Sequence, residues 1–195
     1  MKNGDLIIIP TDTVYGLAAR LYDEVALDKM NELLGRNQTN PIPILCSKMS
    51  DLLPIAETNI VTRAIMKNIW PGALTIVMPA TQAFFEMTGE KTIAARMPNH
   101  PVAIEMIEKY GVLRVTSLNK QDQPPMTDIR MIRREFEPYV VEIHPQDFVQ
   151  SDISSTIIDM TSKEVKILRE GTITMDDLQN AIKNIVNHRA AQESL

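Results

Sequence analysis

The residues best suited to chemistry lie directly after a short apolar segment near the N-terminus. Leu6–Ile9 is aliphatic and rich in β-branched residues, which predicts a buried strand. The stretch that follows, Pro10–Leu17 (PTDTVYGL), places one hydroxyl group on each side of a carboxylate. A strand that ends in small polar groups presents them at the edge of a sheet, where α/β proteins usually place ligands. The stretch is therefore a candidate binding segment, and a proline-initiated turn with capping hydroxyls is the alternative.

Further segments contain arginine, hydroxyl or amide side chains, and most of them also hold glycine or proline. They are, in chain order, Gly35–Ile42 (GRNQTNPI), Trp70–Thr75 (WPGALT), Thr92–Pro98 (TIAARMP), Ser117–Asn119 (SLN), Ser155–Asp159 (STIID) and Leu168–Gly171 (LREG). Chance agreement with one known motif is easy, whereas ordered agreement over all of them is specific. Together with Pro10–Leu17, these segments resemble, in the same order, the motifs of the YrdC family over about residues 6 to 173.

The resemblance implies both a fold and an activity. The fold would be α/β, a twisted open mixed sheet flanked by helices, with a large concave pocket. The activity would be that of a short, single-domain threonylcarbamoyl-AMP synthase, a nucleotidyltransferase that joins L-threonine, bicarbonate and ATP into L-threonylcarbamoyladenylate and releases pyrophosphate. The partner would be the tRNA-modifying threonylcarbamoyl transferase complex, which makes N6-threonylcarbamoyladenosine at position 37 of tRNA.

The residue types in these segments suit anionic and zwitterionic substrates. Guanidinium groups bind carboxylates and phosphates bidentately and stay charged at any working pH, while hydroxyl and amide groups can donate or accept. By the resemblance, the residues at threonine are Thr11, Arg96 and Ser155. On the ATP side the resemblance implies Arg36, Asn40, Thr92, Ser117, Asn119 and Arg169. Salt bridges for the arginines and turn capping for the other residues are the structural alternatives.

The same segments hold no cysteine, histidine or lysine placed as a covalent nucleophile. Catalysis would then rest on positioning and electrostatic stabilisation. Mg²⁺ would arrive with the phosphates, because the sequence shows no dedicated metal cluster and its histidines lack partners at ligand spacing. Cys46, in an apolar run, is expected to be a buried structural thiol. His100 is expected to cap the helix that follows it.

Among the departures from the family pattern, one removes a positive charge. Leu34 stands where the family has lysine, which predicts a loss of about 1.5–3 kcal/mol of ATP binding, unless another residue such as Lys120 or Arg114 supplies the charge. This departure keeps open a non-catalytic YrdC-like paralogue that acts as an RNA-binding or ligand-sensing factor. A carbamoyl-transfer relative, like the YrdC-like domain of the large hydrogenase maturation proteins, is a third alternative.

The composition is that of an ordinary globular domain. The chain has 195 residues, of which 44% are hydrophobic and 23% charged, and a net charge of −5. We expect a single YrdC-like domain over residues 1–187 and a disordered tail over 188–195. The acidic balance means that weak RNA binding would need a local basic face such as Arg130–Arg134. The chain has no apolar run long enough for a transmembrane helix, and its single cysteine and early first strand indicate a cytoplasmic protein.

Apolar segments that alternate with amphipathic patterns predict the elements that must position these residues. The predicted strands are Leu6–Ile9, Ile42–Cys46, Leu74–Met78, Thr92–Arg96, Val112–Thr116, Tyr139–Ile143, Thr156–Met160 and Val165–Leu168. The predicted helices are Val25–Leu34, Asn59–Ile69, Pro101–Tyr110, Asp128–Glu135 and Met175–Asn187. The residues expected to line one concave pocket are Thr11, Arg36, Arg96, Ser117, Ser155 and Arg169.

Overall fold

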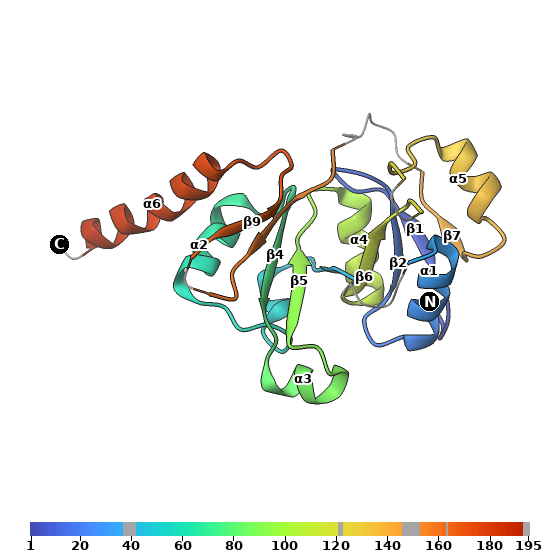
Figure 1. Ribbon diagram of the computed structural model, residues 1–195, viewed down its shortest axis with the longest axis horizontal. Helices are drawn as coiled ribbons and strands as arrows, with labels where there is room; N and C mark the ends of the chain where they lie inside the picture. Colours follow the sequence, from blue (N-terminus) through green and yellow to red (C-terminus); the bar gives the residue numbers. More distant parts are fainter. Residues whose placement is uncertain (37–41, 121–122, 146–152, 163, 193–195) are drawn as a thin grey trace.

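A computed structural model describes residues 1–195 except 37–41, 121–122, 146–152, 163 and 193–195. Its centre is one nine-stranded sheet in the order β7-β1-β2-β6-β3-β5-β4-β8-β9 (Figure 1). The strands are β1 (Ile7–Ile9), β2 (Gly16–Arg20), β3 (Ile44–Leu45), β4 (Leu74–Pro79), β5 (Thr92–Arg96), β6 (Leu113–Ser117), β7 (Glu142–Ile143), β8 (Thr156–Asp159) and β9 (Lys166–Arg169). The helices are α1 (Glu24–Leu34), the 3-10 helix η1 (Met49–Leu52), α2 (Ile60–Ile69), α3 (Gln82–Thr88), α4 (Pro101–Tyr110), α5 (Ile129–Phe136) and α6 (Met175–Gln192).

The sheet is mixed and open, as the sequence predicts. Strand pairs β1–β2, β2–β6, β3–β6, β4–β5 and β8–β9 are antiparallel, whereas β1–β7, β3–β5 and β4–β8 are parallel. Its two outermost strands, β7 and β9, do not meet, so the sheet does not close into a barrel. The segments that resemble family motifs are distributed over strands across this sheet.

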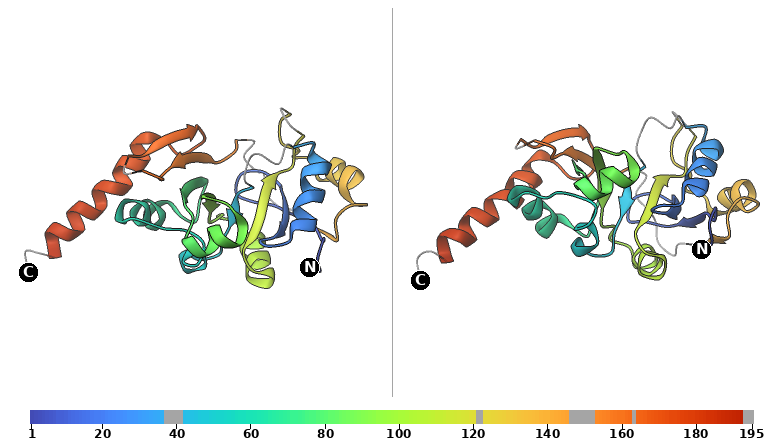
Figure 2. Two further views of the ribbon diagram at one scale, coloured as in Figure 1. Left: turned by 60° about the horizontal axis from the view of Figure 1, so that its bottom comes forward. Right: turned by 90° about the horizontal axis from the view of Figure 1, so that it is seen from below.

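Different helices cover the two faces of the sheet because successive strand residues point to opposite faces. Along β1, Ile8 belongs to a buried cluster shared with α1 and α5, while Ile7 and Ile9 belong to a cluster shared with α4. A further cluster joins β4, β5 and β8 to α2 and to Leu178 near the start of α6. Beyond this contact α6 extends away from the rest of the molecule (Figure 2).

Capping residues set the helix ends that matter for the site. The Asp23 carboxylate accepts from the backbone N–H of Ala26 and begins α1, and Gly35 ends the helix in the left-handed conformation with φ 61°. In α4, Pro101 occupies the first turn and His100 the N-cap position. The His100 side chain makes no capping hydrogen bond, so the prediction that it caps this helix holds for its position only.

Four elements differ most from the sequence prediction, and one of them, the 3-10 helix η1 (Met49–Leu52), was not predicted at all. Strand β2 was not predicted, because the short residues of Gly16–Arg20 carry little β propensity; it forms by pairing with β1 and β6. Helix α3 was also not predicted, although Thr81 caps it and Gly89 ends it in the left-handed conformation. Helix α6 runs to Gln192, beyond the predicted helix end at Asn187. Alanine and glutamine favour helix, which explains the extension. Among the helices of the described residues, none is both long and apolar enough to cross a membrane.

Candidate active site

A cavity of about 330 Å³ collects most of the predicted site residues. Its lining includes Thr11, Arg36, Arg96, Ser117, Ser155 and Arg169, which are the six residues expected to share one pocket. These residues come from segments on both sides of the middle strands of the sheet. The predicted convergence is therefore present in the fold.

Arg36 enters the cavity from the end of α1. The left-handed turn at Gly35 takes the chain out of the helix, and the backbone N–H of Arg36 still bonds to Asn31. Its guanidinium donates to the Ser117 carbonyl at 3.1 Å and to Asn119 Oδ1 at 2.9 Å, and it also contacts the Thr116 hydroxyl. All of these acceptors are neutral. Burial lowers the pKa of Arg36.

Arg96 lies at the end of β5, near the middle of the sheet, and is buried. Its Nε donates to the Gly72 carbonyl at 2.9 Å, its Nη1 to Thr13 Oγ1 at 2.7 Å and its Nη2 to Asp12 Oδ1 at 2.6 Å. Burial lowers the pKa of Arg96, and the Asp12 charge opposes that shift. The guanidinium is thus held on three sides by the protein.

Ser155 and Arg169 line the same cavity and contact each other. Ser155 directly precedes β8, and its hydroxyl lies 2.8 Å from that of Thr75 on the paired strand β4. Arg169, at the end of β9, donates from Nη2 to the Ser155 carbonyl at 2.8 Å and to its hydroxyl at 3.2 Å. Partial burial of the guanidinium, followed by the charge of Arg96, lowers the pKa of Arg169.

The cavity is positive. Among the described residues that line it there are three arginines and no carboxylate. Asp12, which does not line it, is paired with Arg96, while Arg36 and Arg169 bond only to neutral oxygens within the described part of the chain. Two guanidinium charges therefore lack an acidic partner there, and such groups attract anions such as phosphates and carboxylates.

The remaining predicted residues are placed differently. Asn119 does not line the cavity but accepts from Arg36 and from the Ser117 hydroxyl. Thr92 begins β5, at the strand end opposite to Arg96, and is not in the lining. Asn40 lies outside the described residues. Sequence reasoning did not single out Thr13 or Thr75 as site residues, although each lies within a quoted motif and each lines the cavity.

The substituted family position belongs to the core. Leu34 is fully buried in the cluster with Leu6 and Ile8. Neither residue considered as a replacement for the family lysine lines the cavity. Arg114 is buried and paired with Glu90, and Lys120 lies 3.6 Å from Glu135.

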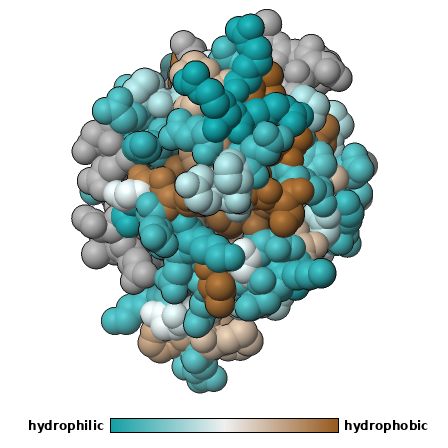
Figure 3. Space-filling view, turned by 90° about the vertical axis from the view of Figure 1, so that its right-hand side faces the viewer, coloured by the Kyte–Doolittle hydropathy of each residue, from teal (hydrophilic) through white to brown (hydrophobic). Residues whose placement is uncertain are grey.

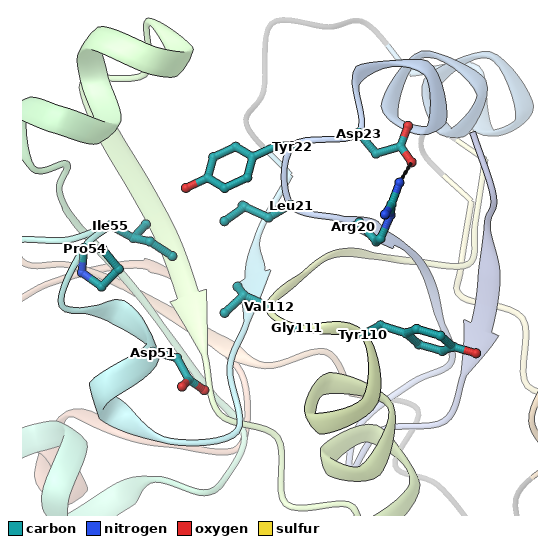
Figure 4. A pocket seen from close by; sticks show the side chains of 10 residues that line it. All are labelled: Arg20, Leu21, Tyr22, Asp23, Asp51, Pro54, Ile55, Tyr110, Gly111 and Val112. Atoms are coloured by element: carbon teal, nitrogen blue, oxygen red, sulfur yellow. Dashed lines mark hydrogen bonds and ion pairs between the residues drawn. The ribbon is translucent and has the colours of Figure 1, made fainter. Parts of the chain in front are cut away.

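A second cavity, of about 470 Å³, lies at the other ends of two site strands (Figure 4). Gly16 of β2 lines the first cavity and Arg20 of the same strand lines the second. The second cavity has apolar walls such as Leu21 and Val112, and its Arg20 is paired with Asp23 at 3.2 Å. It contains none of the predicted site residues, so the chemistry is assigned to the smaller cavity.

The basic segment considered for RNA contact lies on α5. Arg130 pairs with Asp128 at 3.2 Å, and Arg133 lies 3.9 Å from Glu137. The side of the molecule on which α5 lies mixes hydrophobic and hydrophilic side chains (Figure 3). Acidic neighbours thus offset part of the basic charge on which the RNA prediction depends.

Cys46 is a core residue, as predicted. Its thiol is fully buried and lies 3.6 Å from the Arg96 carbonyl, to which it donates. Burial raises the pKa of Cys46 to about 12. Since the thiolate is the reactive form, this cysteine is not placed to act as a nucleophile at neutral pH.

The comparisons with known proteins cover the part of the chain that holds these residues. The family model Sua5/YciO/YrdC, described as "Telomere recombination", matches residues 1–171. The chain is 28% identical over 185 residues to a putative threonylcarbamoyl-AMP synthase of Mycobacterium tuberculosis, covering 93% of this chain and 85% of that protein. It is 30% identical over 194 residues to the threonylcarbamoyl-AMP synthase of Pyrococcus abyssi, covering 97% of this chain but only 57% of that protein.

Solved structures agree with this similarity. The crystal structure of P. abyssi Sua5 complexed with L-threonine superposes with a TM-score of 0.83 at 31% identity, covering 92% of this chain and 54% of that one. E. coli YciO superposes with a TM-score of 0.78 at 25% identity, covering 90% and 87% of the two chains. This chain thus spans about half the length of the archaeal protein and most of the bacterial one.

Proposed function

The chain belongs to the Sua5/YciO/YrdC family, and from this premise we propose that it is a threonylcarbamoyl-AMP synthase. The proposed reaction takes L-threonine, bicarbonate and ATP to L-threonylcarbamoyladenylate, pyrophosphate and water. The observation that carries it is the cavity in which arginines from three motifs meet, two of them bonded only to neutral oxygens among the described residues. A site of this kind suits a triphosphate and a carboxylate.

Threonine would bind at Arg96 and Ser155. An arginine carries five N–H donors, and the protein uses three on Arg96, so two remain for the substrate carboxylate. The Ser155 hydroxyl, beside Thr75, would contact the same substrate. Thr11 lines the same cavity.

ATP would bind at Arg36 and Arg169, with Ser117 and Asn119 beside Arg36. Asn40 and Thr92 complete the ATP side that the family resemblance implies. In the reaction, the threonine nitrogen bonds to the carbonate carbon, water is lost, and a carbamate oxygen bonds to the α-phosphorus as pyrophosphate leaves. The arginines would stabilise the negative charge that gathers on the phosphates.

Mg²⁺ would enter as part of the nucleotide substrate. Hard divalent cations prefer carboxylate and phosphate oxygens, and the described cavity lining offers hydroxyl groups but no carboxylate. The phosphates would therefore supply the charged ligands of the ion. The product would pass, in the cytoplasm, to a threonylcarbamoyl transferase complex that modifies adenosine 37 of tRNAs reading codons that begin with A.

Mass spectrometry of the reaction tests this proposal. Purified protein is incubated with ATP, Mg²⁺, L-threonine and ¹³C-bicarbonate, and each substrate is omitted in turn. We expect threonylcarbamoyladenylate that carries the heavy carbon and forms only in the complete mixture. If threonine and ATP bind but no adenylate forms, the protein is instead the non-catalytic ligand-sensing paralogue.

A further inference from the structure

The opening motif surrounds Arg96. Two of its residues, Asp12 and Thr13, accept from the two terminal nitrogens of this guanidinium, at 2.6 Å and 2.7 Å. The third contact, to the Gly72 carbonyl, comes from a different motif. The orientation of Arg96 is therefore set by residues far from it in sequence.

The direction of the hydrogen bonds around Thr13 follows from counting hydrogens. A threonine hydroxyl has a single hydrogen, and that of Thr11 points to the Val14 carbonyl at 2.7 Å. The 3.0 Å contact between the Thr11 and Thr13 hydroxyls must then carry the hydrogen of Thr13. Thr13 in turn accepts from Arg96. The result is one directed chain from Arg96 through Thr13 and Thr11 to the backbone of Val14.

Thr11 also has a structural role in this chain of hydrogen bonds. Its hydroxyl hydrogen is given to Val14, and its oxygen accepts from both the hydroxyl and the backbone N–H of Thr13. A threonine hydroxyl offers one donor and two acceptor sites. The contacts of Thr11 within the motif therefore hold Thr13 in place.

Asp12 supports Arg96 from the other side. The same carboxylate oxygen that accepts from Arg96 also accepts from the backbone N–H of Asn99 at 2.9 Å. Asp12 therefore links the opening motif to the turn that follows β5. Charge-assisted hydrogen bonds of this kind are shorter and stronger than neutral ones.

We propose that Asp12, Thr13 and Thr11 are positioning residues, which fix the Arg96 guanidinium so that its two remaining N–H groups face the carboxylate of an amino acid. This inference rests on the proposed function for the identity of that ligand. It assigns Asp12 and Thr13 to orientation of the arginine. The affinity for the amino acid then depends on the Thr13 hydroxyl, which accepts from Arg96.

Isosteric substitution of Thr13 tests the proposal. Thr13→Val removes the hydroxyl and keeps the shape, while Thr13→Ser restores the hydroxyl. We expect Thr13→Val to raise the KM for threonine about 10-fold, the factor equivalent to ~1.4 kcal/mol, with the KM for ATP unchanged. Thr13→Ser should stay within about 3-fold of the wild type, a difference below ~0.7 kcal/mol. Thr62→Val is the matched control, since Thr62 is equally buried and hydrogen-bonded on α2.

A readout independent of activity separates this inference from the proposed function. In ¹⁵N NMR of the arginine side chains, the Nη groups of Arg96 should rotate slowly in the wild type and at least about 10-fold faster in Thr13→Val, the same factor as above. Unchanged rotation, or an equal KM for threonine in wild type and Thr13→Val, would overturn the positioning role. A wild type that makes no adenylate would overturn the proposed function and leave the rotation measurement to decide the inference.

Discussion

The three arginines of the cavity differ in what surrounds their charge. Arg96 has Asp12 at 2.6 Å, whereas Arg36 and Arg169 bond to backbone, hydroxyl and amide oxygens within the described structure. A guanidinium with neutral partners keeps its full attraction for an anion. This difference favours the proposed arrangement, in which Arg36 and Arg169 serve the polyanionic nucleotide and Arg96 serves a single carboxylate.

Removal of the Arg96 guanidinium should weaken threonine binding selectively. Arg96→Ala deletes the donors for the carboxylate and leaves Asp12 without its partner, so we expect a loss of about 2–5 kcal/mol in threonine affinity with little change for ATP. Isothermal titration calorimetry measures both affinities. Arg63→Ala, which removes an exposed arginine on α2, is the control and should bind threonine as the wild type does. Unchanged affinity in a folded Arg96→Ala protein would contradict the assignment.

Restoration of the family lysine should fail to help this protein. Leu34 is fully buried among aliphatic residues, and an uncompensated buried charge costs about 3–5 kcal/mol. We therefore expect Leu34→Lys to lower the free energy of unfolding by that amount, without a gain in ATP affinity. Urea unfolding and ATP titration make the measurement, with Glu32→Lys as the exposed control on the same helix. Tighter ATP binding at wild-type stability would show that the side chain reaches the cavity.

Residue identities were predictable from the sequence where a motif carried them. The three arginines and Ser155 line the cavity as expected. The partners that orient them were not predictable, because the contacts of Arg96 with Thr13 and Asp12 join residues more than 80 positions apart. For Thr92 the motif was misleading. Thr92 shares a motif with Arg96, but the two residues stand at opposite ends of the extended strand β5, so only Arg96 reaches the cavity.

At the scale of elements, the predictions were accurate where the sequence marks the two ends of a helix or strand with glycine, proline or polar residues. Helix α4 and strand β5 have the predicted bounds, because Pro101 and Gly111 flank the helix and polar or proline-rich segments flank the strand. Strand β2 was not recognised, since its alanines acquire their burial only between β1 and β6. Tertiary pairing formed an element that local propensity did not indicate.

A close backbone approach makes Gly171 a sensitive point between β9 and β8. A Cβ atom at Gly171 would lie 2.4 Å from the backbone nitrogen of Thr156 and 2.6 Å from the Ser154 carbonyl oxygen. We expect Gly171→Ala to destabilise the fold by about 1–3 kcal/mol, the usual cost of overpacking, and to displace Ser155 from Arg169.

Chemical unfolding and steady-state kinetics measure this effect. The expected result is a lower midpoint in urea together with a raised KM for substrates. Glu170→Ala, at the exposed neighbouring position, should change neither. Wild-type stability and kinetics in Gly171→Ala would mean that the two segments can separate without cost.

At the scale of the whole molecule, a protein of net charge −5 holds a positive cavity. The open mixed sheet makes this possible, because its order places β8 next to β4 and β5 although β8 is distant from both in sequence. The composition indicated a single acidic domain but not this local separation of charge. The fold class followed from the ordered motifs, whereas the charge distribution required the strand order.

The buried thiol predicts how stability changes with pH. The pKa of Cys46 is about 12 in the folded protein against an ordinary 9.0, so the folded state keeps its proton where the unfolded state has lost it. This contribution is fully present below pH 9 and is lost as pH rises from there toward 12. Between about pH 8 and about pH 10 we expect it to fall by ~1.3 kcal/mol.

Comparison with Cys46→Ala isolates this contribution. Urea unfolding of both proteins at the two pH values removes the titration of other groups from the difference. The wild type should lose more unfolding free energy than the variant on going to the higher pH. An equal loss in both proteins would show that the thiol titrates normally in the folded state.

The most direct test of the account is pyrophosphate release by the wild type and by Arg36→Ala, Arg96→Ala and Arg169→Ala, measured with and without threonine and bicarbonate. The account assigns all three arginines to one site, so the wild type should release pyrophosphate only with both co-substrates present. Each variant should lose at least about 10-fold in kcat/KM, equivalent to ~1.4 kcal/mol of transition-state binding. Release that is independent of threonine, or full turnover by any of the folded arginine variants, would contradict the claim that this cavity is the synthase site.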